Sequence, residues 1–207
     1  TLLASSAASD VYKRQIKFGE ATAILAGDAL QALAFETLAK LEGLSPKTVV
    51  RLLSILSSQS GTSGMAIGQA IDLAATGQSL SLDQLKFMHA HKTGALIEAS
   101  VLMGAVSTEI ATEDQYTALK QFAQAIGLAF QIQDDILDVE TTTAQLGKKQ
   151  GSDLANNKPT FISLLGPENA RNQASDLYQQ SIQSLEIFGE QAEALRYIAS
   201  FIINRAY

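Results

Sequence analysis

The sequence predicts an all-α protein, and two patterns support this fold class. Apolar residues recur at spacings of three and four along almost the whole chain, as they do on helices with one buried face. No stretch shows the sustained alternation of apolar and polar residues that is typical of a half-buried strand. With 207 residues, of which 46% are hydrophobic, the chain is long enough to bury a core as a single domain.

Glycine and proline residues divide the first part of the chain into three expected helices. Gly43 and the Ser45-Pro46 pair are stop signals, because glycine ends helices readily and the residue before proline avoids helical backbone angles. The GTSG segment at residues 61–64 and Gly77 supply two further stops. The helices between these stops are expected at residues 19–41, 46–58 and 65–76.

Capping boxes mark two later helix starts. In this motif the side chain of a Ser or Thr accepts a hydrogen bond from the backbone N–H three residues later, and the Gln or Glu at that later position accepts one from the backbone N–H of the Ser or Thr. Two pairs have this spacing: Ser81 with Gln84, and Thr112 with Gln115. The HKTG segment at residues 91–94 interrupts the apolar pattern between them. Helices are therefore expected from just after residue 81, at 94–106, from about 113 to 138, and at 159–165, 167–188 and 190–205.

The segment FQIQDDILDVE at residues 130–140 places three aspartates in one of the most apolar parts of the chain. Asp134, Asp135 and Asp138 fall on one face of the expected helix together with Gln131, because they are related by steps of three, four and seven. The sequence therefore gathers negative charge where a soluble helix would bury apolar side chains.

This acidic face needs a cation from elsewhere. No Lys, Arg or His occurs from residue 121 to residue 147, so no cation nearby in sequence can pair with it, and unpaired charge in apolar surroundings is costly. Carboxylate oxygens suit Mg²⁺ or Mn²⁺, and Mg²⁺ takes one or two carboxylates and completes its shell with water and substrate phosphate. The pattern favours a metal site for a diphosphate ligand over the alternative, a solvated acidic helix end.

Lysines occur in two segments that are candidates to face such a site. Lys92 lies in HKTG, where the alternative is a surface lysine beside a helix start. Lys148, Lys149 and Lys158 lie in GKKQGSDLANNKPT, residues 147–160, directly after the aspartates. Mobile lysines there would neutralise phosphate charge and exclude water on closure, and the alternative is a merely soluble loop.

Small and polar residues elsewhere have roles that the sequence leaves open between structure and function. Gly64 and Gly68 permit close helix packing, and Asp72 lies in an otherwise apolar helix where it needs a partner. His89 and His91 have no third metal ligand nearby, so we expect them on a polar helix surface.

Composition excludes several classes of partner. The 15 Lys and Arg against 21 Asp and Glu give a net charge of −6, so broad attraction to nucleic acid or anionic lipid is not expected. The chain has no cysteine, which rules out disulfides and thiolate metal sites and fits a cytoplasmic location. No apolar run approaches the roughly 20 residues that span a membrane.

Five motifs, taken together, resemble one family. The chain carries AGDAL, GQAIDL, HKTG, FQIQDDILD and GKKQGSDLANNKPT in order, and from Phe18 to about Arg205 it resembles the trans-isoprenyl diphosphate synthases, most closely the bacterial farnesyl diphosphate synthases. The resemblance implies an isoprenoid synthase-type helical bundle around a central cavity, usually a homodimer. It also implies an enzyme that joins an allylic diphosphate, dimethylallyl or geranyl, to isopentenyl diphosphate head to tail, giving farnesyl diphosphate.

The resemblance assigns roles to the motif residues. Asp134 and Asp135 would hold Mg²⁺ against the allylic diphosphate, with Asp138 supporting through water. The remaining site residues are those that would bind diphosphate oxygens, Lys92, Lys148 and Lys158, and those that would line the path of the allylic cation, Thr93 and Gln131.

The resemblance is incomplete at the start of the chain. The family has a first aspartate-rich motif with following arginines, and a basic patch for isopentenyl diphosphate, and neither occurs here. We expect residues 1–15 to be a non-native leader and residues 16–207 to be the C-terminal part of a single synthase domain without its N-terminal helices. Little or no synthase activity is therefore expected of this polypeptide alone, and turnover within about tenfold of a full-length enzyme would contradict that expectation.

Two alternatives stay open. A longer-chain synthase, geranylgeranyl or polyprenyl, would differ only in the cavity floor that stops the growing product. A non-catalytic partner subunit would keep the fold and the dimer surface but lose half of the metal site. The upstream sequence of the source gene separates these alternatives, because an intact acidic motif followed by two arginines favours the enzyme.

Overall fold

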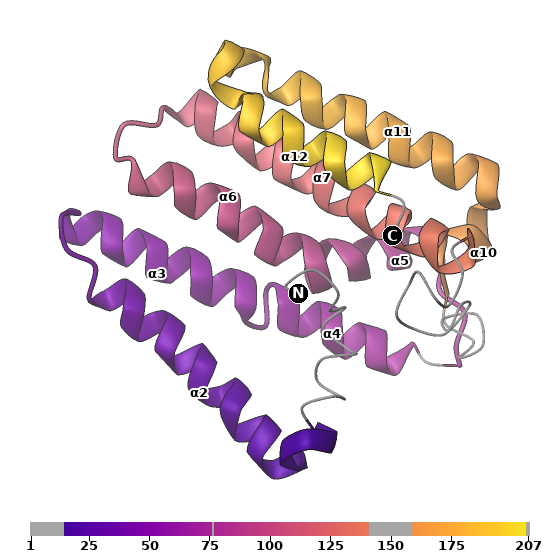
Figure 1. Cartoon of the computed structure of the whole chain (residues 1–207), viewed down its shortest axis with the longest axis horizontal. Helices are drawn as coiled ribbons and strands as arrows, with labels where there is room; N and C mark the ends of the chain where they lie inside the picture. Colours follow the sequence, from indigo (N-terminus) through magenta and orange to yellow (C-terminus); the bar gives the residue numbers. More distant parts are fainter. Residues whose placement is uncertain (1–14, 76, 141–158, 206–207) are drawn as a thin grey trace. The chain divides into compact units, whose positions relative to one another are not determined.

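The computed structural model describes residues 15–75, 77–140 and 159–205, and Figure 1 shows its helices. These ranges contain helices, turns and bends and no strand, which confirms the predicted all-α class. The elements are α2 (Glu20–Ala39), α3 (Pro46–Ser60), α4 (Met65–Ala74), α5 (Leu82–His89), the π-helix η1 (Ala90–Gly94), α6 (Ala95–Ser107), α7 (Glu113–Glu140), α10 (Phe161–Leu165), α11 (Pro167–Ser184), the 3₁₀ segment η2 (Glu186–Ala192) and α12 (Glu193–Asn204).

The chain divides into two compact units, Thr1–Leu53 and Ser54–Tyr207, and α3 contains the boundary. In the first unit α2 has no buried residue, and large apolar side chains such as Leu25 and Leu33 are more than half exposed. The second unit contains every site residue that the sequence predicts.

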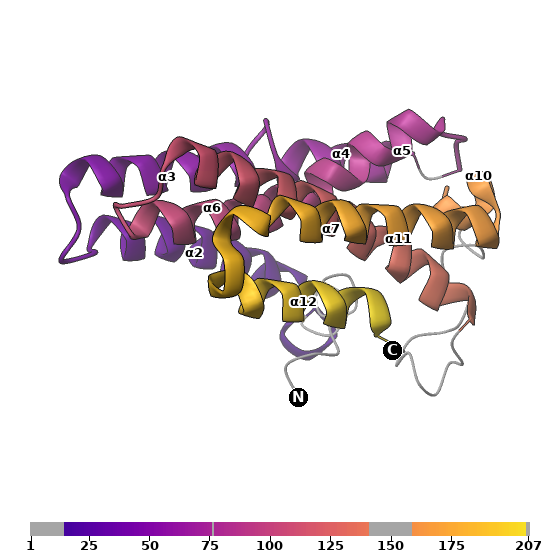
Figure 2. The same cartoon turned by 90° about the horizontal axis from the view of Figure 1, so that it is seen from above.

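α7 is the central element of the second unit. It packs against α11, α6 and α12, and Figures 1 and 2 both show α11 running beside it. α7 contributes to two buried apolar clusters. Ile132 and Ile136 join Phe161 in one of them, and Phe122 and Ile126 form part of the other. The helix carrying the three aspartates is therefore held on more than one side by apolar contacts.

The HKTG segment forms a turn of π-helix and not a break. α5, η1 and α6 follow one another without interruption from residue 82 to residue 107, so the expected interruption is wrong. A π-turn accommodates an extra residue inside a helix, which shifts the apolar pattern while the helix continues. This turn lies tightly against α4, because a Cβ added to Gly68 would be 2.1 Å from the backbone nitrogen of Lys92. Gly68 thus allows the close helix packing that its size predicts.

Most helix ends follow the predicted signals. Ser81 and Gln84 form the predicted capping box, and Thr112 and Gln115 exchange the same pair of hydrogen bonds. The other helices up to α10 begin and end within two residues of their expected bounds, which is the usual uncertainty of such boundaries.

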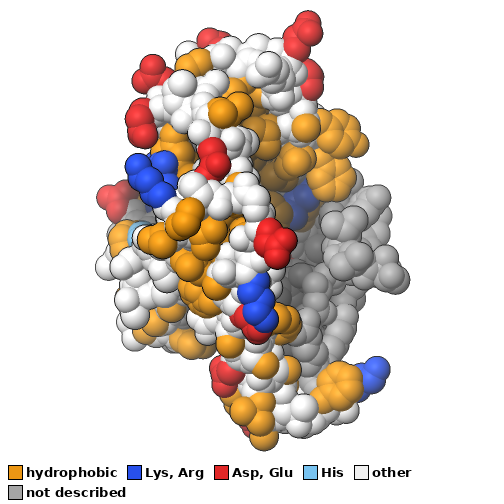
Figure 3. Space-filling view, turned by 90° about the vertical axis from the view of Figure 1, so that its left-hand side faces the viewer, with side chains coloured by type: hydrophobic (Ala, Val, Ile, Leu, Met, Phe, Trp, Pro, Cys, Tyr) orange, Lys and Arg blue, Asp and Glu red, His pale blue; other side chains and the backbone are white. Residues whose placement is uncertain are grey.

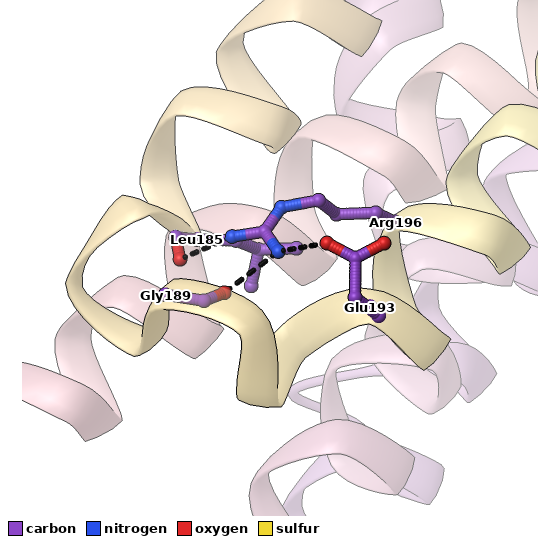
Figure 4. Close-up of polar contacts among 4 residues, drawn as sticks. All are labelled: Leu185, Gly189, Glu193 and Arg196. Atoms are coloured by element: carbon purple, nitrogen blue, oxygen red, sulfur yellow. Dashed lines mark hydrogen bonds and ion pairs between the residues drawn. The ribbon is translucent and has the colours of Figure 1, made fainter.

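The connection between α11 and α12 differs from the prediction. The helix expected at residues 167–188 ends at Ser184 and is followed by the 3₁₀ segment η2. Within η2, Gly189 has φ 54° and ψ −134°. Arg196 holds this turn: its Nη1 donates to the carbonyl oxygen of Gly189 at 2.7 Å and its Nη2 donates to that of Leu185 at 3.1 Å (Figure 4). The guanidinium therefore adds charged donors at two carbonyl groups of the turn, one of which, that of Leu185, also accepts the backbone N–H of Phe188 at 3.1 Å.

On the face that Figure 3 shows, the Lys and Arg side chains of the described residues lie apart from one another, some of them beside Asp or Glu side chains, and they form no continuous basic patch. Over the described ranges, no helix combines the length and the apolar character needed to cross a bilayer.

Gly68→Ala is expected to lower the free energy of unfolding by about 2 kcal/mol or more, because the new methyl group meets backbone atoms that cannot rotate away. The matched control is Gly104→Ala in α6, where an added Cβ meets nothing within 4 Å. That change is expected to leave stability unchanged or raise it by about 0.5–1 kcal/mol, since alanine favours helix. Urea unfolding followed by circular dichroism measures both, and equal stability of the two variants would contradict the close approach.

Arg196→Ala is expected to destabilise the second unit by about 1–2 kcal/mol, because two carbonyl groups lose a charged donor. Arg196 also pairs with Glu193, whose side chain is 72% exposed, so that ion pair should contribute little. Glu193→Gln is therefore the control, with an expected change below about 0.5 kcal/mol. Thermal unfolding in which the two variants lose the same stability would show that the ion pair, and not the carbonyl contacts, matters.

Candidate metal and diphosphate site

Asp135 connects the end of α7 to the start of α10. Its carboxylate oxygen Oδ2 accepts a hydrogen bond from the backbone N–H of Phe161 at 2.7 Å, and the residue is only 8% exposed. α10 begins there because Thr160 and Ser163 form a capping box and the Phe161 side chain is fully buried. The second aspartate of the motif is therefore committed to a structural contact.

Phe161 also contacts α5, the helix that leads into the HKTG segment. Its ring stacks on the ring of His89, with centroids 5.5 Å apart, and His89 lies three residues before Lys92. The expectation of a surface position is wrong for His89, which is 8% exposed. Its position four residues after the fully buried Leu85 was a signal for this, because residues four apart share a helix face.

Asp134 is the exposed member of the three aspartates, with its side chain 46% exposed. It pairs with Arg205, whose Nη2 lies 3.2 Å from Asp134 Oδ1 and also donates to the carbonyl oxygen of Phe130 at 3.2 Å. The guanidinium carbon lies 4.1 Å from the centroid of the Phe130 ring. Burial lowers the pKa of Arg205 below its usual value, while the charge of Asp134 and the hydrogen bond to it act in the opposite direction.

The pairing of Asp134 corrects one premise of the sequence reasoning. No cation lies near the aspartates in sequence, but Arg205 reaches Asp134 across 71 positions. Sequence neighbours alone therefore do not decide whether a carboxylate has a protein cation beside it.

The donor set fits a divalent ion held by one carboxylate. Asp138 is 2% exposed and Asp135 is bonded to Phe161, whereas Asp134 is open to solvent on one side. Within residues 15–75, 77–140 and 159–205, no group of three or more His, Asp or Glu side chains is placed to hold a metal. Because Mg²⁺ needs only one or two protein carboxylates, the residues present fit an ion at Asp134 that completes its shell with water and phosphate.

The Lys92 side chain is held by α4. Its Nζ donates to Asp72 Oδ2 at 2.8 Å, and the two side chains are 29% and 11% exposed. This confirms that Asp72 finds a partner. Thr93 and Gln131 are both partly exposed. The remaining predicted residues, Lys148, Lys149 and Lys158, lie outside the described residues.

A separate open pocket of about 880 Å³ lies among α6, α7 and α11. Glu98, which the sequence did not single out, lines it at 9% exposure and accepts hydrogen bonds from Gln124 Nε2 at 2.9 Å and Gln59 Nε2 at 3.3 Å. His91 and Gly94 also line this pocket, but none of the predicted site residues that the structure describes does.

Comparison with known proteins identifies one family. The family model described as polyprenyl synthetase matches residues 10–198. The farnesyl diphosphate synthase of Escherichia coli (strain K12) is 49% identical over 195 residues, and the match covers 92% of this chain and 65% of that protein. The geranylgeranyl diphosphate synthase of Cyanophora paradoxa is 42% identical over 204 residues, covering 95% of this chain and 68% of that protein.

A solved structure extends the likeness to three dimensions. The geranyltransferase of Helicobacter pylori, crystallised in complex with magnesium and isoprenyl diphosphate, superposes with a TM-score of 0.79 at 37% identity, covering 92% of this chain and 62% of that one. The chain thus spans less than two thirds of the length of the Escherichia coli relative, of which 65% is covered. With a family model matched over most of its length and a relative at 49% identity, the chain belongs to the polyprenyl synthetase family.

Proposed function

We propose that this chain carries the second aspartate motif and the diphosphate-binding lysines of a farnesyl diphosphate synthase. The reaction is the joining of dimethylallyl or geranyl diphosphate to isopentenyl diphosphate. One observation carries the proposal: Asp134, the half-exposed aspartate, lies on the helix that Phe161 ties to the segment holding Lys92. A metal-binding carboxylate and a phosphate-binding cation thus belong to one buried framework.

Mg²⁺ is the metal we propose, with Mn²⁺ as the substitute. Asp134 offers hard carboxylate oxygens, and the chain has no thiolate to favour a softer metal. Bound between Asp134 and the diphosphate, the ion would stabilise the charge of the leaving group. Asp135 and Asp138 stay predictions as ligands, and their burial points to a supporting role behind Asp134.

The chain's own residues would supply the rest of the chemistry. Lys92, oriented by Asp72, would hold diphosphate oxygens and so favour ionisation of the allylic C–O bond. Thr93 and Gln131 would line the path of the allylic cation until the double bond of the second substrate attacks it and a proton is lost. Lys148 and Lys158 are proposed to bind the same diphosphate.

A longer-chain product is the second candidate, favoured by the 42% identity to a geranylgeranyl diphosphate synthase. The farnesyl-type relative is closer, at 49% identity, so we place farnesyl diphosphate first. A non-catalytic partner subunit, a homodimeric assembly and a cytoplasmic location stay predictions.

Asp134→Asn is expected to weaken Mg²⁺-dependent binding of geranyl diphosphate at least about tenfold, because it removes the charge that holds the metal while keeping the side-chain shape. Isothermal titration calorimetry with and without Mg²⁺ measures this effect. The matched control is Glu140→Gln, at the end of the same helix, where Glu140 forms an exposed ion pair with Arg171. Its affinity should stay within about twofold of the unmodified chain, since exposed pairs contribute little. Equal losses in both variants would contradict a specific site at Asp134.

A further inference from the structure

Arg205 has contacts on several sides, but not all of its guanidinium N–H donors have an acceptor among the described residues. Nη2 alone serves two acceptors, the Phe130 carbonyl oxygen and Asp134 Oδ1, and each contact is 3.2 Å long. The side chain is 14% exposed, and among the described residues its buried Nε has no hydrogen-bond acceptor. Strong arginine–carboxylate pairs use two parallel N–H donors, so this pair is far from the most stable geometry available to it.

The Asp134 end of the pair is accessible to a competing cation. Its side chain is 46% exposed, against 14% for Arg205. A solvated carboxylate with one long contact gains little from its partner. Arg205 contacts only Oδ1 of Asp134, so a divalent ion on the open side would share this carboxylate with the guanidinium, and the two positive charges would repel each other.

We propose that Arg205 is a resident counter-ion of Asp134 that competes with the divalent metal for this carboxylate and so sets the concentration at which the metal binds. The inference rests on the proposed function, because it takes Asp134 as the metal-binding residue. It gives Arg205, the residue that follows the end of α12, a role in controlling metal affinity.

Displacement is feasible because Arg205 keeps other contacts when Asp134 is taken. The Phe130 ring and carbonyl oxygen hold the guanidinium independently of the carboxylate. The backbone of Arg205 is held separately, by a long hydrogen bond of 3.5 Å from Gln133 Nε2 to its carbonyl oxygen. The exchange therefore does not leave an isolated buried charge, which would be costly.

The test is binding of Mn²⁺ alone, measured from the electron paramagnetic resonance signal of free Mn²⁺. Arg205→Gln is expected to bind Mn²⁺ roughly three- to tenfold more tightly than the unmodified chain, since it removes a competitor worth a modest ion pair. Arg205→Lys keeps the charge and is expected to stay within about twofold of the unmodified chain. Circular dichroism confirms that each variant keeps its helical content.

The matched control is Arg171→Gln. Arg171 lies on α11 and forms an exposed ion pair with Glu140, at the end of the helix α7 that also carries Asp134. Its Mn²⁺ affinity is expected to change less than about twofold. An equal gain in Mn²⁺ affinity in Arg171→Gln and Arg205→Gln would show that the loss of any nearby positive charge has the same effect. That result would overturn the proposed competition. Unchanged affinity in Arg205→Gln would also overturn it, while loss of binding in Asp134→Asn would leave the proposed function standing. Absence of Mn²⁺ binding in every variant would overturn the competition too, whereas the proposed function is decided separately by Mg²⁺-dependent binding of geranyl diphosphate.

Discussion

The hydrogen bond from the Phe161 N–H to the Asp135 carboxylate is the constraint on which the candidate site depends. It joins two positions that flank residues 141–158, and it is buried, so neither group has water as an alternative partner. Its charged acceptor makes it worth about 1.5–3 kcal/mol by general experience with such bonds. Because the Phe161 ring stacks on His89, this contact links the end of α7 to α5, the helix that leads into the π-turn carrying Lys92, and the π-turn also packs directly against α7.

One short motif thus provides three chemically different carboxylates. Asp135 accepts a hydrogen bond from the backbone of α10, and Asp138 is 2% exposed. Only Asp134 presents its oxygens to solvent to a large extent. The motif spacing puts all three on one helix face, but their exposures differ, and only Asp135 has a hydrogen bond to α10 among the contacts described. A division of this kind explains how a cluster of negative charge persists in an apolar part of the chain without three metal contacts.

The parts of the structure that depend on local chemistry could be predicted from the sequence. Apolar periodicity located the helices, and the side chains of Ser81 and Thr112 marked two of their starts, because capping acts over three residues. Gly68 was correctly read as a close-packing position. The features that the sequence did not predict depend on residues far apart in the chain or on unusual helix geometry. A π-turn has no distinct composition, so HKTG read as a break, and the Arg205–Asp134 pair joins residues 71 positions apart.

Both described cations of the candidate site are already paired. Lys92 is bound to Asp72 and Arg205 to Asp134, so the four charges sum to zero. A divalent ion arriving alone would add two positive charges and displace Arg205 from its carboxylate, whereas a diphosphate arriving alone would bring negative charge towards Asp134. If the two arrived together their charges would largely cancel, and Lys92 would donate to phosphate oxygens while Asp72 still orients it. Under the proposed function, this pairing of charges would favour joint capture of metal and diphosphate over capture of either one. In prenyl transfer this coupling has a chemical use, because a diphosphate leaves readily only when its developing charge is already balanced.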